Sequence, residues 1–316
     1  MNLNLNLNNN NRSKKIINVY KPKLTKKKKV YCSPTHRKNK YSCFTKPALL
    51  KIAKTWNQNN SSNKIPLASA TTVKVLWKRI NEKLKEKCYG EWCWIEQDFV
   101  KSLEDEEINN TFRPKLPRQW CHKTRDWLST TDIESVMVQY EDLYEDFYFI
   151  GPVPIDFDDE LSAGYCVVDE LCKINLKQLK KKGIKRVGIV FNLDKHTESG
   201  SHWIAMFVDL TKHGIYYWDS YGEKPPKEVK VLVKKLQEQG RNMNINLKYQ
   251  RNTVRHQFKT SECGVYCMYF IVKLLQGKKF KEFINRVVKD DEMNMKRGYF
   301  YSPTCEAEDN NNSLNN

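Results

Sequence analysis

Residues 260–277 read TSECGVYCMYFIVKLLQG. The part from Cys263 to Gln276 is almost continuously apolar and has the length of a helix, and Gly277 is typical of the position after a helix end. The pattern therefore predicts a helix buried in the core. Cys263 would lie at its N-terminus, where unpaired backbone N–H groups and the helix dipole stabilise a thiolate.

The residues before this helix predict a sheet. Several short runs are rich in β-branched and aromatic residues and are bounded by turn residues. A surface helix is expected to begin at Pro225-Pro226, to run to Gln239 and to close at Gly240. Strands in one block with helices around them predict an α+β fold with a central mixed sheet. The expected strands cover 187–191, 203–208, 215–218 and 244–249.

The first half of the chain predicts helices. Apolar residues recur at helical spacing in 47–56, 72–87 and 94–103. Thr131 precedes Glu134 by three residues, which is a capping box and predicts another helix start. We therefore expect four regions along the chain. These are a basic disordered tail over 1–40, a helical region over 41–115, a catalytic domain over 116–305 and a disordered tail over 306–316.

Positive charge is concentrated at the N-terminus. The chain has 316 residues and a net charge of +18, and residues 1–81 contain 19 Lys and Arg residues and no Asp or Glu. Such a segment is typical of an arm that binds nucleic acid, and DNA is the partner that we would expect. It is equally typical of a solvated tail. The run from Lys26 to Lys29 also resembles a nuclear address.

The ten cysteines of the chain predict free thiols rather than a disulfide framework, because the chain is long and opens with polar residues instead of a signal peptide. Cys32, His36 and Cys43 could supply three metal ligands, but their spacing fits no common site and no fourth ligand is evident, so we expect no metal. Three further cysteines are expected in the core: Cys166, Cys172 and Cys267. No apolar run approaches the roughly 20 residues needed to cross a bilayer, so no membrane contact is expected.

Nucleophilic chemistry at Cys263 needs an imidazole, a group that orients it and donors for an oxyanion. His202 begins an expected strand. If 203–208 and 215–219 form an antiparallel hairpin whose paired residue numbers sum to an odd value near 421 to 423, Asp219 lies at the same end and on the same face as His202. Asp219 can then hold one ring nitrogen of His202 and leave the other for the thiol.

The remaining candidates depend on position alone. Gln257 lies six residues before Cys263, on the loop that leads to the helix, and its carboxamide could donate to an oxyanion. Gly264 predicts the close approach of another backbone, which we expect to be that of a substrate. His256 is the alternative base and Asp209 the alternative carboxylate, although Asp209 is expected at the turn end of the hairpin, away from His202.

Together these residues resemble the catalytic signature of the superfamily of ubiquitin-like-protein (SUMO) proteases and adenoviral proteases. That signature has His-Trp, an acid on the next strand, Gln with Cys six residues later, and Gly after the Cys. The matching segments are His202-Trp203, Trp218-Asp219-Ser220, Gln257 and 262–266. Trp127-Leu128 and the helix after it resemble a substrate-side element of the same family.

The resemblance implies a papain-like, adenain-like cysteine protease core without cofactor. It assigns Cys263 as nucleophile, His202 as general base and acid, Asp219 as its orienting partner and Gln257 as oxyanion donor. It also implies substrate contacts from Trp127 and from Trp203, in a tight tunnel that favours Gly-Gly before the scissile bond. The basic N-terminal region and the segments 149–156 and 191–194 resemble proteases of large nucleocytoplasmic DNA viruses, which cut structural precursors.

Three functions follow as hypotheses. The first is an endopeptidase that processes viral structural precursors in the virion and in the virus factory of the host cytoplasm. The second is a protease that deconjugates SUMO or another ubiquitin-like protein, for which the nucleus is the alternative location. The third is an inactive protease fold that binds nucleic acid, which the presence of all four expected catalytic residues argues against.

Overall fold

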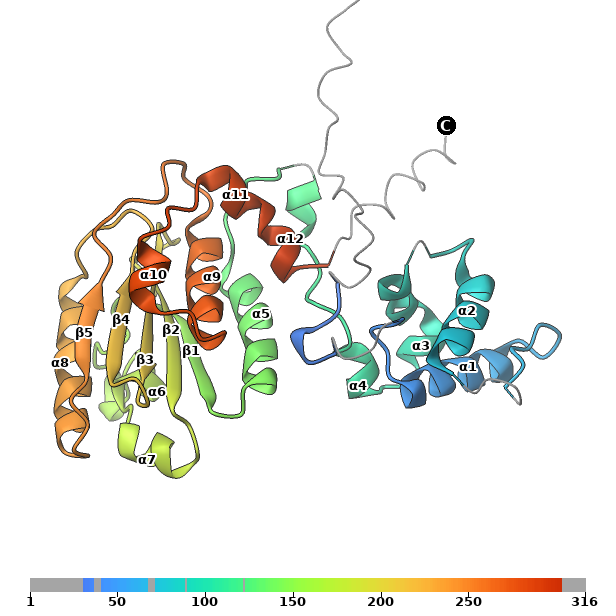
Figure 1. The fold of residues 1–316 in the computed structure, drawn as a ribbon, viewed down its shortest axis with the longest axis horizontal. Coiled ribbons are helices and arrows are strands. Elements are labelled where there is room, and N and C mark those ends of the chain that lie inside the picture. The colour runs from blue at the N-terminus through green and yellow to red at the C-terminus, as the bar shows by residue number, and fades with distance from the viewer. Residues whose placement is uncertain (1–30, 37–40, 68–71, 89, 122, 303–316) are drawn as a thin grey trace, which may run out of the picture.

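The computed structural model describes residues 31–36, 41–67, 72–88, 90–121 and 123–302. Most of the expected tail over 1–40, all of the expected tail over 306–316 and the last residues of the expected catalytic domain lie outside these ranges. A helical N-terminal part lies beside a larger part that contains the sheet (Figure 1).

The sheet has five strands in the order β1-β2-β3-β4-β5. Its outer pairs, β1 with β2 and β4 with β5, are parallel, and the two inner pairs are antiparallel. The expected mixed sheet in an α+β fold is thereby confirmed. The strands are β1 (Phe147–Pro154), β2 (Arg186–Asn192), β3 (Trp203–Asp209), β4 (Gly214–Trp218) and β5 (Lys248–Arg251).

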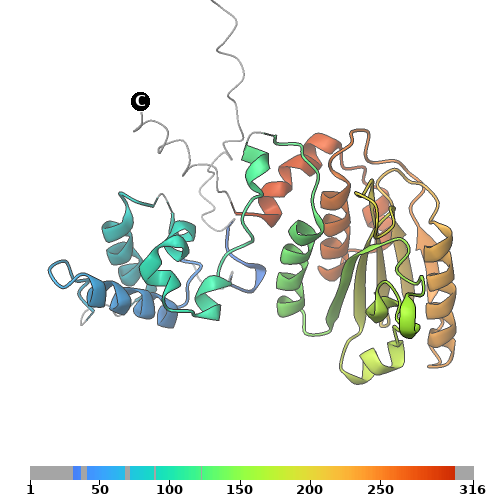
Figure 2. The ribbon, with the colours of Figure 1, turned by 180° about the vertical axis from the view of Figure 1, so that it is seen from behind.

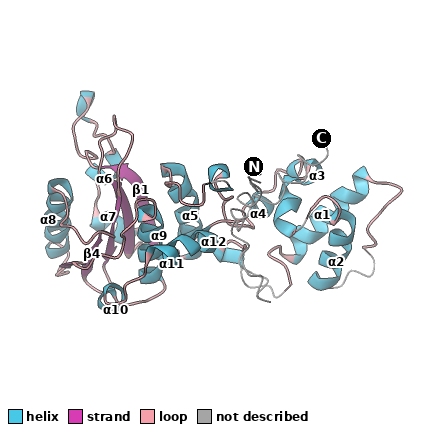
Figure 3. Ribbon diagram, turned by 90° about the horizontal axis from the view of Figure 1, so that it is seen from above, coloured by secondary structure: helices cyan, strands magenta, loops and turns pink. Residues whose placement is uncertain are grey.

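Helices cover both faces of this sheet, as Figure 3 shows from above, with α8 on one side of the strands and α9 and α5 on the other. One core cluster joins the sheet to α5 and α9, and another joins the opposite face to α8. Figure 2 shows the same layers from behind. The helices of this part are α5 (Thr130–Leu143), α6 (Asp169–Cys172), α7 (Leu176–Lys181), α8 (Lys227–Arg241), α9 (Cys263–Leu275), α10 (Phe280–Ile284), α11 (Asp290–Met295) and α12 (Arg297–Phe300).

The N-terminal part has its own apolar core between residues 32 and 112. It contains α1 (Lys46–Asn59), α2 (Val73–Leu84), α3 (Asp98–Lys101) and α4 (Glu106–Asn109). Thr45 and Thr72 cap the first two of these helices, since each hydroxyl accepts a hydrogen bond from the third residue after it. The expected helix over 94–103 is broken, because residues 91–96 form a 3-10 helix and only 98–101 form α3.

The prediction of free thiols is wrong for six of the cysteines. Disulfides join Cys32 to Cys43, Cys88 to Cys93 and Cys166 to Cys172. The Cys166–Cys172 pair is half-buried rather than in the core, whereas Cys263 and Cys267 are free and buried. The paired cysteines are only 11, 5 and 6 positions apart, but the length of the chain and its polar start had favoured free thiols.

The helix over 263–276 and the strands over 187–191, 203–208 and 215–218 are confirmed, but several details were wrong. Strand β1 was not predicted, because Pro152 interrupts it; an edge strand tolerates this proline through a register shift after Ile150. Strand β5 begins only at Lys248, after a turn in which Asn244 has φ of 59°. Gly240 does not close α8 but lies inside it.

The helix start near Thr131 is confirmed with a different cap. The capping box consists of Ser129 and Asp132 instead of Thr131 and Glu134, and α5 begins at Thr130. The hydroxyl of Ser129 accepts from the backbone N–H of Asp132, whose carboxylate accepts from the backbone N–H of Ser129. Every helix in the described part of the chain is too short or too polar to cross a membrane.

Candidate active site

Cys263 is the first residue of α9, and its side chain is buried, with 1% of its surface exposed. The sulfur therefore lies beside the unpaired N–H groups of the helix N-terminus, which favour a thiolate. Cys267 lies one turn further along the same helix, fully inside the core, and burial raises its pKa well above that of an ordinary thiol. Of the two free thiols in the described part of the chain, Cys263 is thus the one in an environment that suits a nucleophile.

His202 and Asp219 meet at one end of the hairpin formed by β3 and β4. Residues paired in this hairpin sum to 423, as in Ala205 with Trp218, so the predicted register is confirmed. His202 Nε2 lies 2.8 Å from Asp219 Oδ1. Burial disfavours the charged imidazole, but hydrogen bonds to Asp219 and Cys263 and the charge of Cys263 outweigh it and raise the pKa of His202 to about 9.

Two neighbours, Asn252 and Tyr221, fix Asp219 and His202, and sequence reasoning missed both of them. Asn252 accepts from the Asp219 backbone N–H at 3.0 Å and donates to the Asp219 carbonyl at 2.6 Å. The backbone N–H of Tyr221 donates to Asp219 Oδ1 at 2.9 Å. The ring of Tyr221 stacks on His202 with centroids 4.5 Å apart. The same hairpin register, continued beyond the strands, places Tyr221 opposite His202. This contact could therefore have been predicted from the sequence.

Gln257 is fully buried on the loop before α9. Its Oε1 accepts from the Ser220 hydroxyl at 2.6 Å, and its Nε2 donates to the Lys259 carbonyl at 2.7 Å. A primary amide carries two hydrogens on its nitrogen, so one remains for an oxyanion. The Ser220 carbonyl also accepts the backbone N–H of Gln257 at 2.9 Å, and Ser220 therefore fixes this residue from two directions.

The segment Trp127-Leu128 lies against the start of α9. The indole N–H of Trp203, which is 4% exposed, donates to the Leu128 carbonyl at 3.0 Å, whereas Trp127 is 39% exposed. A Cβ on Gly264 would come within 3.0 to 3.2 Å of Leu128 and Ile133. The expectation that Gly264 admits a substrate backbone is therefore wrong, because Gly264 lets α5 and its leading loop pack against α9.

The two alternative residues lie elsewhere. His256 is buried with its Nδ1 accepting the Val288 backbone N–H at 3.3 Å, and its ring meets Trp218 edge to face. Asp209 lies at the opposite end of β3, where Oδ1 accepts two backbone N–H groups and one hydroxyl of the turn. His256 thus has a place in the core, and Asp209 stabilises a turn.

His256 supports a prediction about acid stability. Burial lowers its pKa, so the folded protein holds it neutral while the unfolded chain protonates it near pH 6.5. The contribution of His256 to stability is fully present above pH 6.5 and is lost as the pH falls below that value. Urea unfolding between pH 7.5 and 5 gives the free energy of unfolding at each pH. Its slope against pH should be steeper in the wild type than in His256→Gln, by up to about 1.4 kcal/mol per pH unit. Equal slopes would contradict this account.

Arg297 is a residue that sequence reasoning missed. It comes from α12 and is 4% exposed, and its guanidinium lies 3.9 Å over the ring of Trp120. One nitrogen, Nη2, donates to the carbonyls of Asp126 at 2.6 Å and Ser261 at 2.9 Å. Arg297 therefore joins the loop that carries Trp127 to the loop that leads to Cys263.

We expect Arg297 to act as a positioning residue. Replacement by Ala should lower kcat by about 10- to 100-fold, because small misplacements of reacting groups have effects of this size. Millimolar guanidine should restore part of the activity by occupying the vacated cavity. Arg286→Ala, at an exposed arginine, is the control and should neither lose activity nor respond to guanidine. A loss in Arg297→Ala that guanidine does not repair, accompanied by unfolding, would contradict a positioning role.

Cys32, His36 and Cys43 were the possible metal ligands of the sequence. The sulfurs of Cys32 and Cys43 form a disulfide. The third potential ligand near them is the carboxylate of Glu91 and not the ring of His36. His36 Nδ1 instead lies 2.8 Å from the Thr35 hydroxyl. Within the described residues, Cys32 and Cys43 therefore cross-link the N-terminal part.

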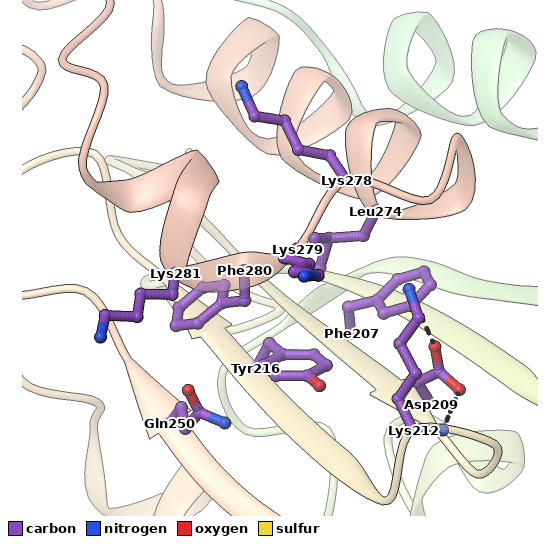
Figure 4. Close-up of a pocket in the computed structure, with 10 residues that line it drawn as sticks. All are labelled: Phe207, Asp209, Lys212, Tyr216, Gln250, Leu274, Lys278, Lys279, Phe280 and Lys281. Atoms are coloured by element: carbon purple, nitrogen blue, oxygen red, sulfur yellow. Dashed lines mark hydrogen bonds and ion pairs between the residues drawn. The ribbon is translucent and has the colours of Figure 1, made fainter.

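Two cavities of the described structure differ in their distance from the His202–Asp219 pair. One is lined by the His202–Asp219 pair and by Tyr221, and also by three charged residues, Glu223, Lys224 and Glu228. The other is at the turn end of the sheet, where Phe280 lies over Tyr216 and four lysines surround the opening (Figure 4). Of the candidate residues, this second cavity is lined by Asp209 alone, the alternative carboxylate that stabilises the turn.

Known proteins resemble this chain in sequence and in fold. Residues 173–308 match the model described as "Ulp1 protease family, C-terminal catalytic domain". The chain is 32% identical to a thiol protease of Acanthamoeba polyphaga mimivirus, over 85% of this chain and 92% of that protein. It is 26% identical to a "SUMO-1 cysteine protease" of African swine fever virus, over 73% of this chain and 89% of that protein.

The fold is similar to a solved structure over most of its length. The crystal structure of an African swine fever virus protease superimposes with a TM-score of 0.64 at 21% identity, covering 87% of this chain and 96% of that one. The likeness includes the N-terminal part as well as the sheet, since it extends well beyond the residues that match the family model.

Proposed function

Because this chain belongs to the Ulp1 protease family of cysteine proteases, we propose that it is an endopeptidase that cuts viral structural precursor proteins after Gly-Gly-type sites. The observation that carries the proposal is the hydrogen-bonded His202–Asp219 pair beside a thiol at a helix N-terminus. The similarity to viral thiol proteases over most of the chain supports a viral substrate.

In the proposed reaction Cys263 attacks the scissile carbonyl as a thiolate. His202, oriented by Asp219, holds the thiol proton and delivers it to the leaving amine, and it then activates the water that releases the acyl group. The second N–H of the Gln257 amide and the backbone N–H of Cys263 would stabilise the oxyanion. Trp127 and Trp203 border the substrate, and a narrow passage there would accept glycine more readily than a residue with a side chain.

A cleavage experiment tests the substrate class. Structural precursors from a related virus would be incubated with the wild-type protein and with Cys263→Ala, and the new termini would be identified by mass spectrometry. Fragments that end in Gly-Gly and appear only with the wild type are expected. Fragments without glycine before the cut would overturn the proposed specificity. The chain itself has no two adjacent glycines, so self-cleavage at such a site is not expected.

Deconjugation of a ubiquitin-like protein is the second candidate, and the name "SUMO-1 cysteine protease" given to a relative favours it. Ubiquitin-like proteins that carry an electrophile at the C-terminus separate the two functions. A deconjugating protease should become covalently labelled on Cys263 by one of them, whereas a precursor-specific protease should stay unlabelled.

The basic N-terminal segment gives a proposal about location. We propose that it contacts DNA, which would keep the protease in the virion and in the virus factory of the host cytoplasm. The support is the excess of Lys and Arg over residues 1–81, which contain no Asp or Glu. Residues 1–30 lie outside the described ranges. A DNA affinity that falls steeply with salt, and that is lost when the segment is removed, is the expected result.

A further inference from the structure

An exposed aromatic side chain lies next to the candidate oxyanion residue. Phe258 follows Gln257 directly and is 68% exposed, and the nearby Val254 is 48% exposed. The position of Phe258 is nevertheless fixed, because its backbone N–H donates to Asp290 Oδ2 at 2.9 Å. A large apolar side chain held in water at a fixed place is typical of a contact surface.

Phe258 belongs to a stack of rings and charge that begins at the catalytic histidine. Tyr221 lies parallel to His202, with an interplanar angle of 17°. The guanidinium of Arg255 lies 4.8 Å over the Tyr221 ring and 5.0 Å over the Phe258 ring. We call Tyr221, Arg255 and Phe258 the Arg255 ledge. The ledge extends from the outer face of the imidazole to the protein surface.

Arg255 has unused hydrogen-bonding capacity on this ledge. Its Nε donates to the Gln257 carbonyl at 2.6 Å, which fixes the plane of the guanidinium. Among the described residues, its two Nη groups have no hydrogen-bond or ion-pair partner. A fixed, planar guanidinium with free N–H groups is suited to binding a carboxylate through two bonds. Beside it, Phe258 offers an apolar surface.

The chemistry of His202 indicates which part of a substrate would reach the ledge. The imidazole forms a hydrogen bond with Cys263, and one face of its ring stacks on Tyr221. As general acid it must protonate the amine of the leaving fragment, so this fragment passes close to the imidazole. Trp127 and Leu128, in contrast, lie at the start of α9, where Leu128 packs on the Gly264 side.

From these contacts we propose that the Arg255 ledge is a subsite for the leaving side of the substrate and selects an acidic residue with an apolar neighbour. The inference rests on the proposed protease function, since it names a part of the substrate that the function leaves open. The carboxylate binds the Nη groups of Arg255, and the apolar neighbour packs on Phe258. The ledge contributes binding energy rather than chemistry, so it acts on KM.

Two peptides test the proposal. They share a Gly-Gly sequence before the cut and differ after it, one carrying Asp-Leu and the other Lys-Leu. The wild type should cleave the Asp-Leu peptide with a KM about tenfold lower and a similar kcat, because one charge-assisted contact is worth about that factor. The preference should disappear in Arg255→Ala and weaken in Phe258→Ala. Arg286→Ala, at an exposed arginine outside the ledge, should retain it.

A second readout separates this inference from the proposed cleavage. Cys263→Ala binds the two peptides without turnover, and fluorescence anisotropy should give about tenfold tighter binding of the Asp-Leu peptide, lost in Cys263→Ala/Arg255→Ala. If the wild type cuts neither peptide but the binding difference stands, the Gly-Gly proposal fails and the ledge holds. Equal binding of both peptides, or a fall in kcat in Arg255→Ala with the preference intact, would overturn the ledge and leave Arg255 as a support for Gln257.

Discussion

Cys263→Ala should lower the hydrolysis of a peptide substrate by about 10⁴-fold or more, because loss of the nucleophile in a coupled catalytic group removes nearly all of the chemical rate enhancement. The variant should remain folded, since the change removes one buried sulfur at a helix end. The measurement is kcat/KM under conditions in which wild-type turnover is complete within minutes.

Cys267→Ala is the matched control for this prediction. Cys267 is the other free cysteine of the described residues and belongs to the same helix, but it lies wholly in the core and burial raises its pKa. Its replacement should lower stability slightly and leave kcat/KM within about a factor of three, since core packing acts mainly on stability. Comparable losses in both variants would show that the helix as a whole, and not the thiol of Cys263, had been disturbed.

Asp219→Asn should reduce kcat by about 10²- to 10⁴-fold, because an amide no longer stabilises the protonated imidazole or selects its productive tautomer. Asp219 is one of the groups that raise the pKa of His202 to about 9. Its removal should therefore move the alkaline limb of the pH–rate profile to lower pH. Kinetics from acid through alkaline pH measure both effects.

The contrasting change is Asp209→Asn. Asp209 is buried as well, but it accepts hydrogen bonds from the Thr211 hydroxyl and from the backbone of Thr211 and Lys212 at the other end of β3. This variant should unfold at lower urea concentration with an unchanged pH–rate profile. An unshifted profile in Asp219→Asn, or a shifted one in Asp209→Asn, would contradict the assignment of Asp219 as the partner of His202.

The features that were predictable from sequence depend on local geometry. A short hairpin fixes its own register, so the positions of His202 and Asp219 followed from the turn between them. The nearly continuous apolar run after Cys263 allowed only a buried helix. The role of Gly264 was misjudged, since a glycine that admits a ligand and one that admits a neighbouring helix have the same local pattern.

The contacts that could not be predicted join distant parts of the chain. Asn252 meets Asp219 from 33 positions away, and Arg297 reaches Asp126 from 171 positions away. No local pattern distinguishes these residues from other polar residues of the chain. The disulfides were missed for a different reason: they join cysteines only 11, 5 and 6 positions apart, but the length of the chain and its polar start favoured free thiols.

The position of Arg297 on α12, the last helix of the described chain, bears on the order in which the protein is synthesised. Cys263, His202 and Asp219 leave the ribosome before Arg297 does. Until α12 emerges, nothing from that helix joins the Ser261 carbonyl to the loop of Trp127. The link between the Ser261 carbonyl and the loop of Trp127 can therefore form only after Cys263, His202 and Asp219 have been synthesised, so we expect it to be a late step in folding.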